Sequence, residues 1–284
     1  MSVHAMNVSR EDTALQRSAV VVEQMDNKDE IVVKDLVVSY DTASGDRMTA
    51  VDGVSLTLKQ GEFVSIIGPS GCGKTTVLNL LAGLINPRFT GEMLVRGHHS
   101  FAGNPDIAYM LARDSLLPWR TTLQNAEYGM ELRGVPSVAR RAKALQMLTQ
   151  VGLGEFANSY PKALSHGMRQ RCALARTFAL DSAIFLMDEP FGALDAQTKF
   201  QLEDVLLELW SQHRRTVVFI THDLAEAVAL SDRVIVMSHR PGRIVADVPI
   251  DLPRPRSVRD LQKEPRFHAL YSSLWNHLET KGVQ

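Results

Sequence analysis

The sequence predicts an α/β fold in which buried parallel strands alternate with helices. Four short apolar runs, at residues 63–67, 183–187, 216–220 and 233–237, have the composition of strands that are buried on both faces. Helical patterns lie between these runs, as at residues 75–82, where positions 77, 78, 80 and 81 are apolar. A chain of 284 residues with 45% hydrophobic content is long enough for one large core with a subdomain.

The first apolar run leads directly into a glycine-rich loop, Gly68-Pro-Ser-Gly-Cys-Gly-Lys-Thr75. The glycines let backbone N–H groups point inward, and the N-terminus of the following helix adds positive potential. A strand before the loop and a helix after it favour a phosphate site over a glycine-rich turn without a ligand. A small-molecule kinase or a GTPase would carry such a loop too.

Within this loop, we expect Lys74 to contact the β- and γ-phosphates and the Thr75 hydroxyl to bind Mg²⁺. The residues expected to hold the nucleotide phosphates are Gly68, Pro69, Ser70, Gly71, Cys72, Gly73, Lys74, Thr75 and Thr76.

Two carboxylates, Asp188 and Glu189, follow the apolar run at 183–187. Because ligands bind at the carboxyl ends of parallel strands, Asp188 is expected beside Mg²⁺, which it would hold through water. Glu189 is then placed to act as general base on an attacking water. Such a pair can also be a solvated strand end, but the loop upstream favours the catalytic interpretation.

A histidine, His222, ends the apolar run at 216–220 after Thr221, and Asp223 follows it. A lone histidine is more often structural. Its place at the carboxyl end of a strand predicts instead a donor to the γ-phosphate that senses hydrolysis.

A further motif lies between the loop and the carboxylates, Leu164-Ser-His-Gly-Met-Arg-Gln170, and Ser165 in it is a good N-cap for a helix. Together with the preceding motifs and their order, it resembles the signature of ABC (ATP-binding cassette) ATPases. This resemblance spans residues 31 to 240. It implies a P-loop NTPase (RecA-like) core, an antiparallel β subdomain and an inserted α-helical subdomain at about 112–165.

The resemblance also implies the ligands ATP and Mg²⁺ and a dimer of two copies. Ser165 and Gly167 of one copy would face the phosphate loop of the other across ATP, although Ser165 can equally act as a simple helix cap. Tyr40 matches the aromatic residue that stacks on adenine in the family, and a surface tyrosine on a strand is the alternative. Residues 192–195 match the loop that crosses the dimer interface.

Two positions depart from the family pattern. His166 stands where the signature usually has a glycine, so its imidazole would either add a donor or crowd the phosphate. Ala112 stands where the family has a glutamine, and alanine cannot bind Mg²⁺ or orient water. Arg113 and Asp114 are the neighbours that would have to substitute for it.

The string Leu116-Leu-Pro-Trp119 resembles ATPase subunits of importers for nitrate, sulfonates, taurine and related solutes, as does Asp251-Leu-Pro-Arg-Pro-Arg256. This resemblance implies an integral-membrane permease as partner and, indirectly, an extracytoplasmic solute-binding protein. Residues 116–119 form either an exposed patch that receives the permease or a turn buried inside the helical subdomain.

Composition limits the other classes of function. The formal net charge of −1 gives no electrostatic basis for a nucleic-acid partner. The longest apolar runs are about six residues, against the ~20 needed to cross a bilayer, so membrane association is expected only through a partner. Residues 1–28 are expected to be a flexible extension without a secretory signal, and 29–250 the nucleotide-binding domain. Two cysteines give no disulfide framework.

The C-terminal part, 251–284, is expected to be a basic linker followed by an amphipathic helix. That helix either packs on its own domain or contacts a second copy. The function expected from all these features is a Mg²⁺-dependent ATPase that drives solute import from the cytoplasmic face of the inner membrane. The alternative is a nucleotide-binding regulatory module that hydrolyses ATP weakly, which Ala112 and His166 favour.

Overall fold

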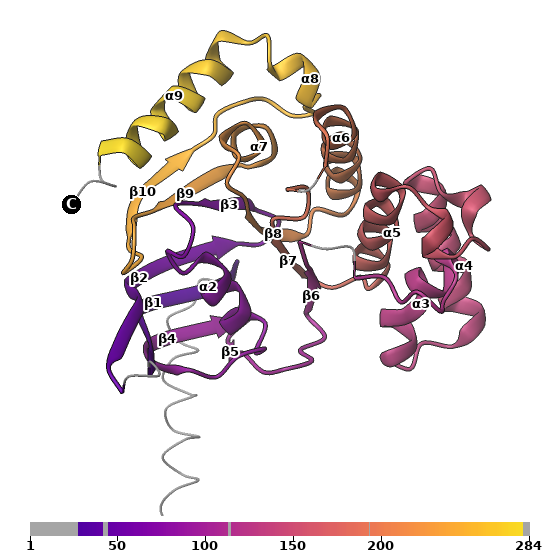
Figure 1. The fold of residues 1–284 in the computed structure, drawn as a ribbon, viewed down its shortest axis with the longest axis horizontal. Coiled ribbons are helices and arrows are strands. Elements are labelled where there is room, and N and C mark those ends of the chain that lie inside the picture. Colours follow the sequence, from indigo (N-terminus) through magenta and orange to yellow (C-terminus); the bar gives the residue numbers. More distant parts are fainter. Residues whose placement is uncertain (1–27, 42–44, 113–114, 193, 281–284) are drawn as a thin grey trace, which may run out of the picture.

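The structure, a computed structural model, describes residues 28–41, 45–112, 115–192 and 194–280. The expected N-terminal extension therefore lies outside the described residues, except for residue 28, and so do Arg113, Asp114 and Ala193. The chain folds into two β-sheets with helices around them (Figure 1).

The first sheet is antiparallel, in the order β2-β1-β4-β5. Its strands are β1 (Asp29–Asp41), β2 (Arg47–Lys59), β4 (Arg88–Val95) and β5 (His98–His99). Alternation along residues 54–58 predicts a half-buried strand, and β2 follows that pattern, with Val54, Leu56 and Leu58 buried.

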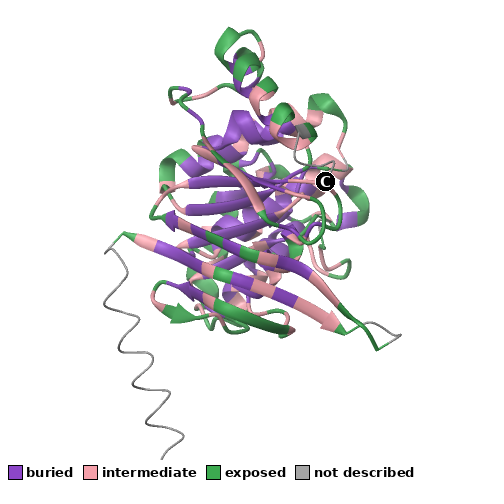
Figure 2. Ribbon diagram, turned by 90° about the vertical axis from the view of Figure 1, so that its left-hand side faces the viewer, coloured by how far each residue is buried: buried purple, intermediate pink, exposed green. Residues whose placement is uncertain are grey.

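The second sheet has the order β10-β9-β3-β8-β7-β6 and is parallel from β9 to β6, while β10 runs antiparallel to β9. Its strands are β3 (Phe63–Ile67), β6 (Ile107–Met110), β7 (Ile184–Asp188), β8 (Thr216–Ile220), β9 (Arg233–Met237) and β10 (Ile244–Pro249). Helices cover its faces, so the central strands are buried along most of their length (Figure 2). Each of the four apolar runs forms one of these strands.

Helix α2 (Lys74–Leu81) lies between the two sheets, where it contacts β4 on one side and β7 and β8 on the other. Its apolar side chains join a core that includes strands of both sheets. The loop from β3 to α2 is short, so the N-terminus of α2 lies beside the carboxyl end of β3 and of its parallel neighbours.

Three helices pack against one another beyond β6: α3 (Thr122–Leu132), α4 (Ser137–Gln150) and α5 (His166–Ala179) (Figure 1). Two short 3₁₀ turns, Gly154–Phe156 and Pro161–Ala163, lie between α4 and α5. Sequence periodicity predicts helices over residues 138–151 and 168–180, close to the observed α4 and α5. Thr121 begins α3 with a capping box, in which its hydroxyl and the Gln124 side chain bond each other's backbone N–H.

Two further helices, α6 (Ala196–His213) and α7 (Leu224–Leu230), pack against each other and follow β7 and β8 in the chain. Asp195 caps α6 by accepting from the Thr198 N–H at 3.0 Å, and Asp223 caps α7. Since β7 and β8 are neighbours, both caps lie close to the same edge of the sheet.

The C-terminal helices α8 (Val258–Leu261) and α9 (Pro265–Thr280) pack on this domain. Phe267, Leu270 and Leu274 of α9 are buried, so the helix packs on its own chain, while Trp275 stays about half exposed. No helix in the described part of the chain is long and apolar enough to span a bilayer.

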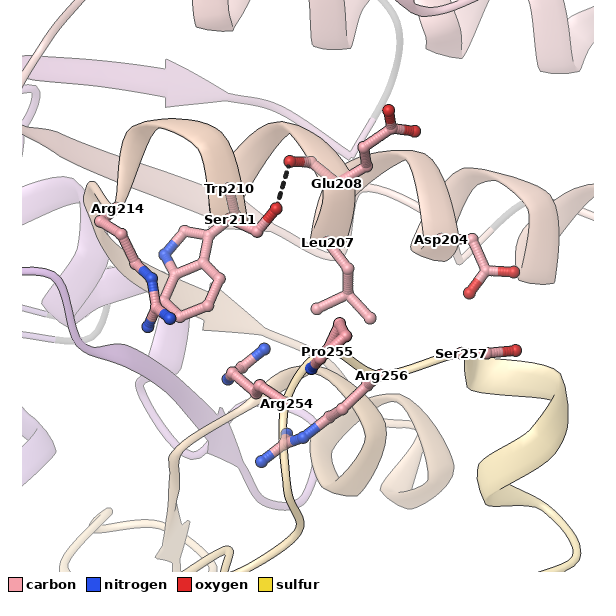
Figure 3. A pocket seen from close by; sticks show the side chains of 10 residues that line it. All are labelled: Asp204, Leu207, Glu208, Trp210, Ser211, Arg214, Arg254, Pro255, Arg256 and Ser257. Carbon is pink, nitrogen blue, oxygen red and sulfur yellow. Dashed lines mark hydrogen bonds between the residues drawn. The ribbon is translucent and has the colours of Figure 1, made fainter.

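The basic linker before α8 is held by its arginines. The Arg256 guanidinium donates to the Ala229, Ser231 and Leu252 carbonyls, and Arg254 bonds Asp232 and the Leu230 carbonyl. Arg254 also lies over the Trp210 ring at 4.1 Å, in a groove between α6 and the linker (Figure 3). Burial lowers the pKa of Arg256 to about 10. These contacts attach the linker to the end of α7.

Candidate functional site

The glycine-rich loop joins β3 to α2 and needs glycine for steric reasons. Gly73, the N-cap of α2, has a φ of 103°, and a Cβ there would lie 2.6 Å from Val51 Cγ2. A Cβ at Gly68 would lie 2.8 Å from the Met237 carbonyl oxygen. The loop can therefore close against the neighbouring strands only with glycine at these two positions.

Lys74, the first residue of α2, is buried, and its ammonium group is directed back into the loop. Its Nζ donates to the Gly68 carbonyl at 2.7 Å and to the Pro69 carbonyl at 3.0 Å. The charge is thus held where the loop and the positive end of α2 meet, the place at which a phosphate is bound most favourably.

The metal-binding residues expected from the sequence lie next to each other. Asp188 ends β7, and the Thr75 hydroxyl donates to its Oδ1 at 3.2 Å. Burial raises the pKa of Asp188 above its usual value, and the nearby Glu189 adds to this, while the Thr75 hydrogen bond and Lys74 oppose it. A cation bound here would offset the cost of burying the charged carboxylate.

Glu189 and His222 also lie together, at the ends of the paired strands β7 and β8. The His222 Nδ1 is 3.2 Å from the Glu189 Oε2, and the His222 side chain is mostly exposed to the open edge of the sheet. Glu189 has a φ of 47°, uncommon for a side chain other than glycine, asparagine or aspartate. Glu189 also lines the pocket formed by the loop.

A pocket of about 270 Å³ is lined by most of these residues. The expected residues that line it are Tyr40, Ser70, Gly71, Gly73, Lys74, Thr75, Thr76 and Glu189. Cys72 does not line it, because its side chain is buried in the apolar core. Any contact of Cys72 with a ligand in the pocket must therefore be made by its backbone.

Three pocket residues were not expected from the sequence: Met48, Ala50 and Arg240. Met48 pairs with Tyr40 across β1 and β2, and Arg240 follows β9, which is the parallel neighbour of β3. The Arg240 Nε donates to the Gly71 carbonyl at 3.3 Å. The only sequence signal for Arg240 is a Pro-Gly turn after a buried strand.

The signature residues lie outside this pocket within one chain. Ser165 is exposed and caps α5, accepting from the Met168 N–H at 3.3 Å. Gly167 packs against α6, where an added Cβ would lie 2.6 Å from Thr198 Cγ2. His166 is within hydrogen-bond distance of Arg169, its Nδ1 lying 3.2 Å from a guanidinium nitrogen.

Ala112 and the string at 116–119 lie between β6 and α3. Ala112 is exposed, and its carbonyl accepts from the buried Gln170 side chain at 3.3 Å. Trp119 is 71% exposed, whereas Leu116 and Leu117 are half-buried, so both interpretations of this string hold in part. The buried Asn125 fixes the turn by bonding the Leu117 N–H at 2.7 Å and three carbonyls.

Comparison with known proteins agrees with this geometry. The sequence profile described as ABC transporter matches residues 51–192. An ATP-binding protein of Brucella abortus (strain 2308) is 47% identical over 227 residues, 80% of this chain and 86% of that protein. A bicarbonate transport ATP-binding protein of Synechococcus elongatus is 38% identical over 247 residues, 86% of this chain but 37% of that longer protein.

Among solved structures, a dimeric ATP-binding cassette bound to ADP and Pi in a post-hydrolysis state superimposes with a TM-score of 0.68. It is 30% identical, and the match covers 78% of this chain and all of that one. The expected P-loop NTPase fold class is thereby confirmed. The chain belongs to the ABC transporter family and is an ATP-binding subunit of that family.

Proposed function

We propose that this chain is the Mg²⁺-dependent ATPase subunit of an importer for a small solute of the nitrate, sulfonate or taurine class. The observation that carries the proposal is the convergence of Lys74, Thr75, Asp188, Glu189 and His222 around one edge of the parallel sheet. A relative that is named for bicarbonate transport supports an importer of small anions.

The residues divide the work at this edge. Lys74 contacts the β- and γ-phosphates, and Tyr40 stacks on adenine at the other end of the pocket, worth about 1–3 kcal/mol. Glu189 accepts a proton from the attacking water, and His222 donates to the γ-phosphate. The Glu189 carboxylate and the His222 imidazole are in contact, at 3.2 Å, so that both groups act on the same region of the site.

The residues also fit Mg²⁺. The Thr75 hydroxyl and the Asp188 carboxylate are both oxygen ligands, and Mg²⁺ bound to a nucleotide usually takes one or two such protein groups. When bound, the metal would neutralise phosphate charge. Burial raises the pKa of Asp188 despite the opposing effects of Thr75 and Lys74, so a further cation at this carboxylate would stabilise its charged form.

A second copy of the chain completes the site. Ser165 and Gly167 lie away from the pocket of their own chain, and Ser165 is exposed at a helix N-terminus, where it can meet a γ-phosphate held by another copy. We also propose the domain division expected from the sequence, a nucleotide-binding domain at 29–250 with a helical subdomain at about 112–165, against which α5 packs.

The exposed Trp119 is proposed to contact an integral-membrane permease. An exposed tryptophan on a turn that a buried asparagine holds rigid is typical of an interaction site. The chain then sits peripherally on the cytoplasmic face of the inner membrane, and a solute-binding protein outside delivers the solute to the permease. These partners give the importer its solute specificity.

The alternative is a weakly hydrolysing regulatory module. Ala112 favours it, because this exposed position offers no side-chain amide to metal or water. His166 favours it too, since an imidazole stands where the family signature usually has a glycine and would crowd the phosphate.

Steady-state Mg-ATP hydrolysis of wild type and Glu189→Gln tests the proposal. Turnover that is lost in the variant while ATP affinity is kept supports the ATPase. If the wild type hydrolyses ATP no faster than Glu189→Gln, both alone and with a permease, the result would favour the regulatory module.

A further inference from the structure

A buried polar cluster lies beneath the turn that carries His222. The Lys199 Nζ of α6 is 2.6 Å from the Asp223 Oδ2 and 2.8 Å from the Glu226 Oε1. The Thr221 hydroxyl donates to Glu226 and accepts from the Asp223 N–H at 2.9 Å. Glu203, one turn after Lys199 on α6, faces the same cluster.

The cluster places three carboxyl groups around one ammonium group. Glu203 and Glu226 are 1% and 4% exposed, and the Glu203 Oε2 has no hydrogen-bond partner among the described residues. Burial raises the pKa of Glu203, and the charges of Glu226 and Asp223 add to this, while Lys199 opposes it. Three carboxylates would give the cluster a net charge of −2 against the single ammonium, and a neutral Glu203 reduces this excess to −1.

The cluster holds both neighbours of His222. The side chains of Thr221 and Asp223 form hydrogen bonds within the cluster, whereas the His222 side chain points outward and contacts Glu189. Asp223 is therefore held by Lys199 of α6, and Thr221 is held by Glu226 of α7, which itself contacts Lys199. A shift of α6 relative to α7 would move the imidazole.

The first turn of α6 also contacts the signature helix. Gly167 of α5 packs against Thr198 with no room for a Cβ, and Lys199 is the next residue along the chain. Contacts thus run without interruption from Gly167 through Thr198 and Lys199 to the His222 turn.

We propose that Lys199, ion-paired with Asp223 and Glu226, is a positioning residue that couples the signature helix to His222. A γ-phosphate bound at Ser165 and Gly167 by a second copy would then set the position of His222 in the site of the same chain. This rests on the proposed function, because His222 acts on the γ-phosphate only there. The coupling would let one nucleotide influence hydrolysis of the other.

A double-mutant cycle on the full-length protein tests the coupling. The variants are Lys199→Met, His222→Ala and their combination, with the exposed Glu208→Gln of α6 as control. Measured are kcat and KM for Mg-ATP and the affinity for a fluorescent ATP analogue. We expect Lys199→Met to lower kcat about tenfold at an unchanged nucleotide affinity, since small misplacements of catalytic groups cost this much or more.

In the His222→Ala background, the same substitution should change kcat by less than about twofold, because its effect passes through His222. Equal losses in both backgrounds would overturn the inference while leaving the role of His222 intact. A His222→Ala protein with wild-type kcat would instead contradict the proposed function and the inference with it.

The isosteric Glu203→Gln gives a second test, because it keeps position 203 uncharged at every pH. Above the raised pKa, wild-type Glu203 ionises beside Glu226 and Asp223, with Lys199 as the only cation facing it among the described residues. For each protein, kcat at pH 9.5 is divided by kcat at pH 7. This ratio should be at least threefold lower for the wild type than for Glu203→Gln. Coincident profiles would contradict the inference, even if Lys199→Met fails to fold.

Discussion

The Nδ1 of His222 lies 3.2 Å from the Oε2 of Glu189, although 33 positions along the chain separate the two residues. Each follows the carboxyl end of a parallel strand, β7 or β8, and these strands are paired. The contact places the imidazole next to Glu189, which lines the pocket together with Lys74 and Thr75. A carboxylate and an imidazole, two groups that can exchange protons with a substrate, thus lie close to the glycine-rich loop.

Replacing Glu189 by glutamine keeps its size but removes the base. We expect kcat for Mg-ATP to fall by about 10²–10⁴-fold, the contribution typical of general acid–base catalysis. ATP affinity should stay within about threefold, because the phosphates are held by the loop and not by this carboxylate. Single-turnover hydrolysis and equilibrium ATP binding measure the two quantities, and a parallel loss of both would contradict this role.

Replacing Lys74 by alanine should weaken ATP binding. A hydrogen bond to a charged group contributes about 1.5–3 kcal/mol, so the Kd should rise roughly 10- to 150-fold. The exposed Lys263→Ala, which changes the net charge equally, serves as control and should leave the Kd unchanged. An unchanged ATP affinity in Lys74→Ala would show that the loop assignment is wrong.

Stability should depend on pH through Glu203, whose pKa is raised to about 8, chiefly by burial. The folded protein keeps this proton in a range where the unfolded chain, with a pKa near 4.5, has lost it. The contribution of Glu203 to the unfolding free energy is therefore complete below pH 4.5. Between that pH and about 8 it falls by about 1.4 kcal/mol per pH unit, and it is lost as the pH rises through about 8.

Urea unfolding at pH 6 and pH 8 measures this dependence. Relative to Glu203→Gln, the wild type should lose on the order of 2 kcal/mol of unfolding free energy between these values. Parallel pH dependences in the two proteins would show that Glu203 is ionised throughout.

The turn at 116–119 allows a matched pair of substitutions. Asn125 is buried and holds the turn by four hydrogen bonds, so Asn125→Ala should reduce the unfolding free energy by about 1–3 kcal/mol. Trp119→Ala, at an exposed position, should change it by less than about 0.5 kcal/mol. Urea titrations of both variants check this, and a strongly destabilised Trp119→Ala would mean that the tryptophan packs on its own chain.

Much of this fold can be predicted from the sequence because strands that are buried on both faces consist of continuous apolar residues. Residues 63–67, 216–220 and 233–237 coincide with β3, β8 and β9, and the loop context places Lys74 at the start of α2. The capping role of Ser165 is likewise local, since a serine before a helix bonds an N–H only three residues away.

The features that sequence reasoning missed depend on contacts between distant elements. Arg240 reaches the pocket only because β9 pairs with β3, an order that no local pattern encodes. Glu203 is a similar case, since its position on α6 gives no sign that it faces Glu226 of α7. Trp275 shares a helical face with buried residues yet stays half exposed at the edge of that face.

The central claim is that two copies form a composite ATPase site. Steady-state Mg-ATP hydrolysis as a function of protein concentration, with Glu189→Gln as blank, tests it most directly. We predict a specific activity that rises with concentration and is abolished in the variant. A specific activity that is independent of concentration in a protein shown to be monomeric would contradict the composite site.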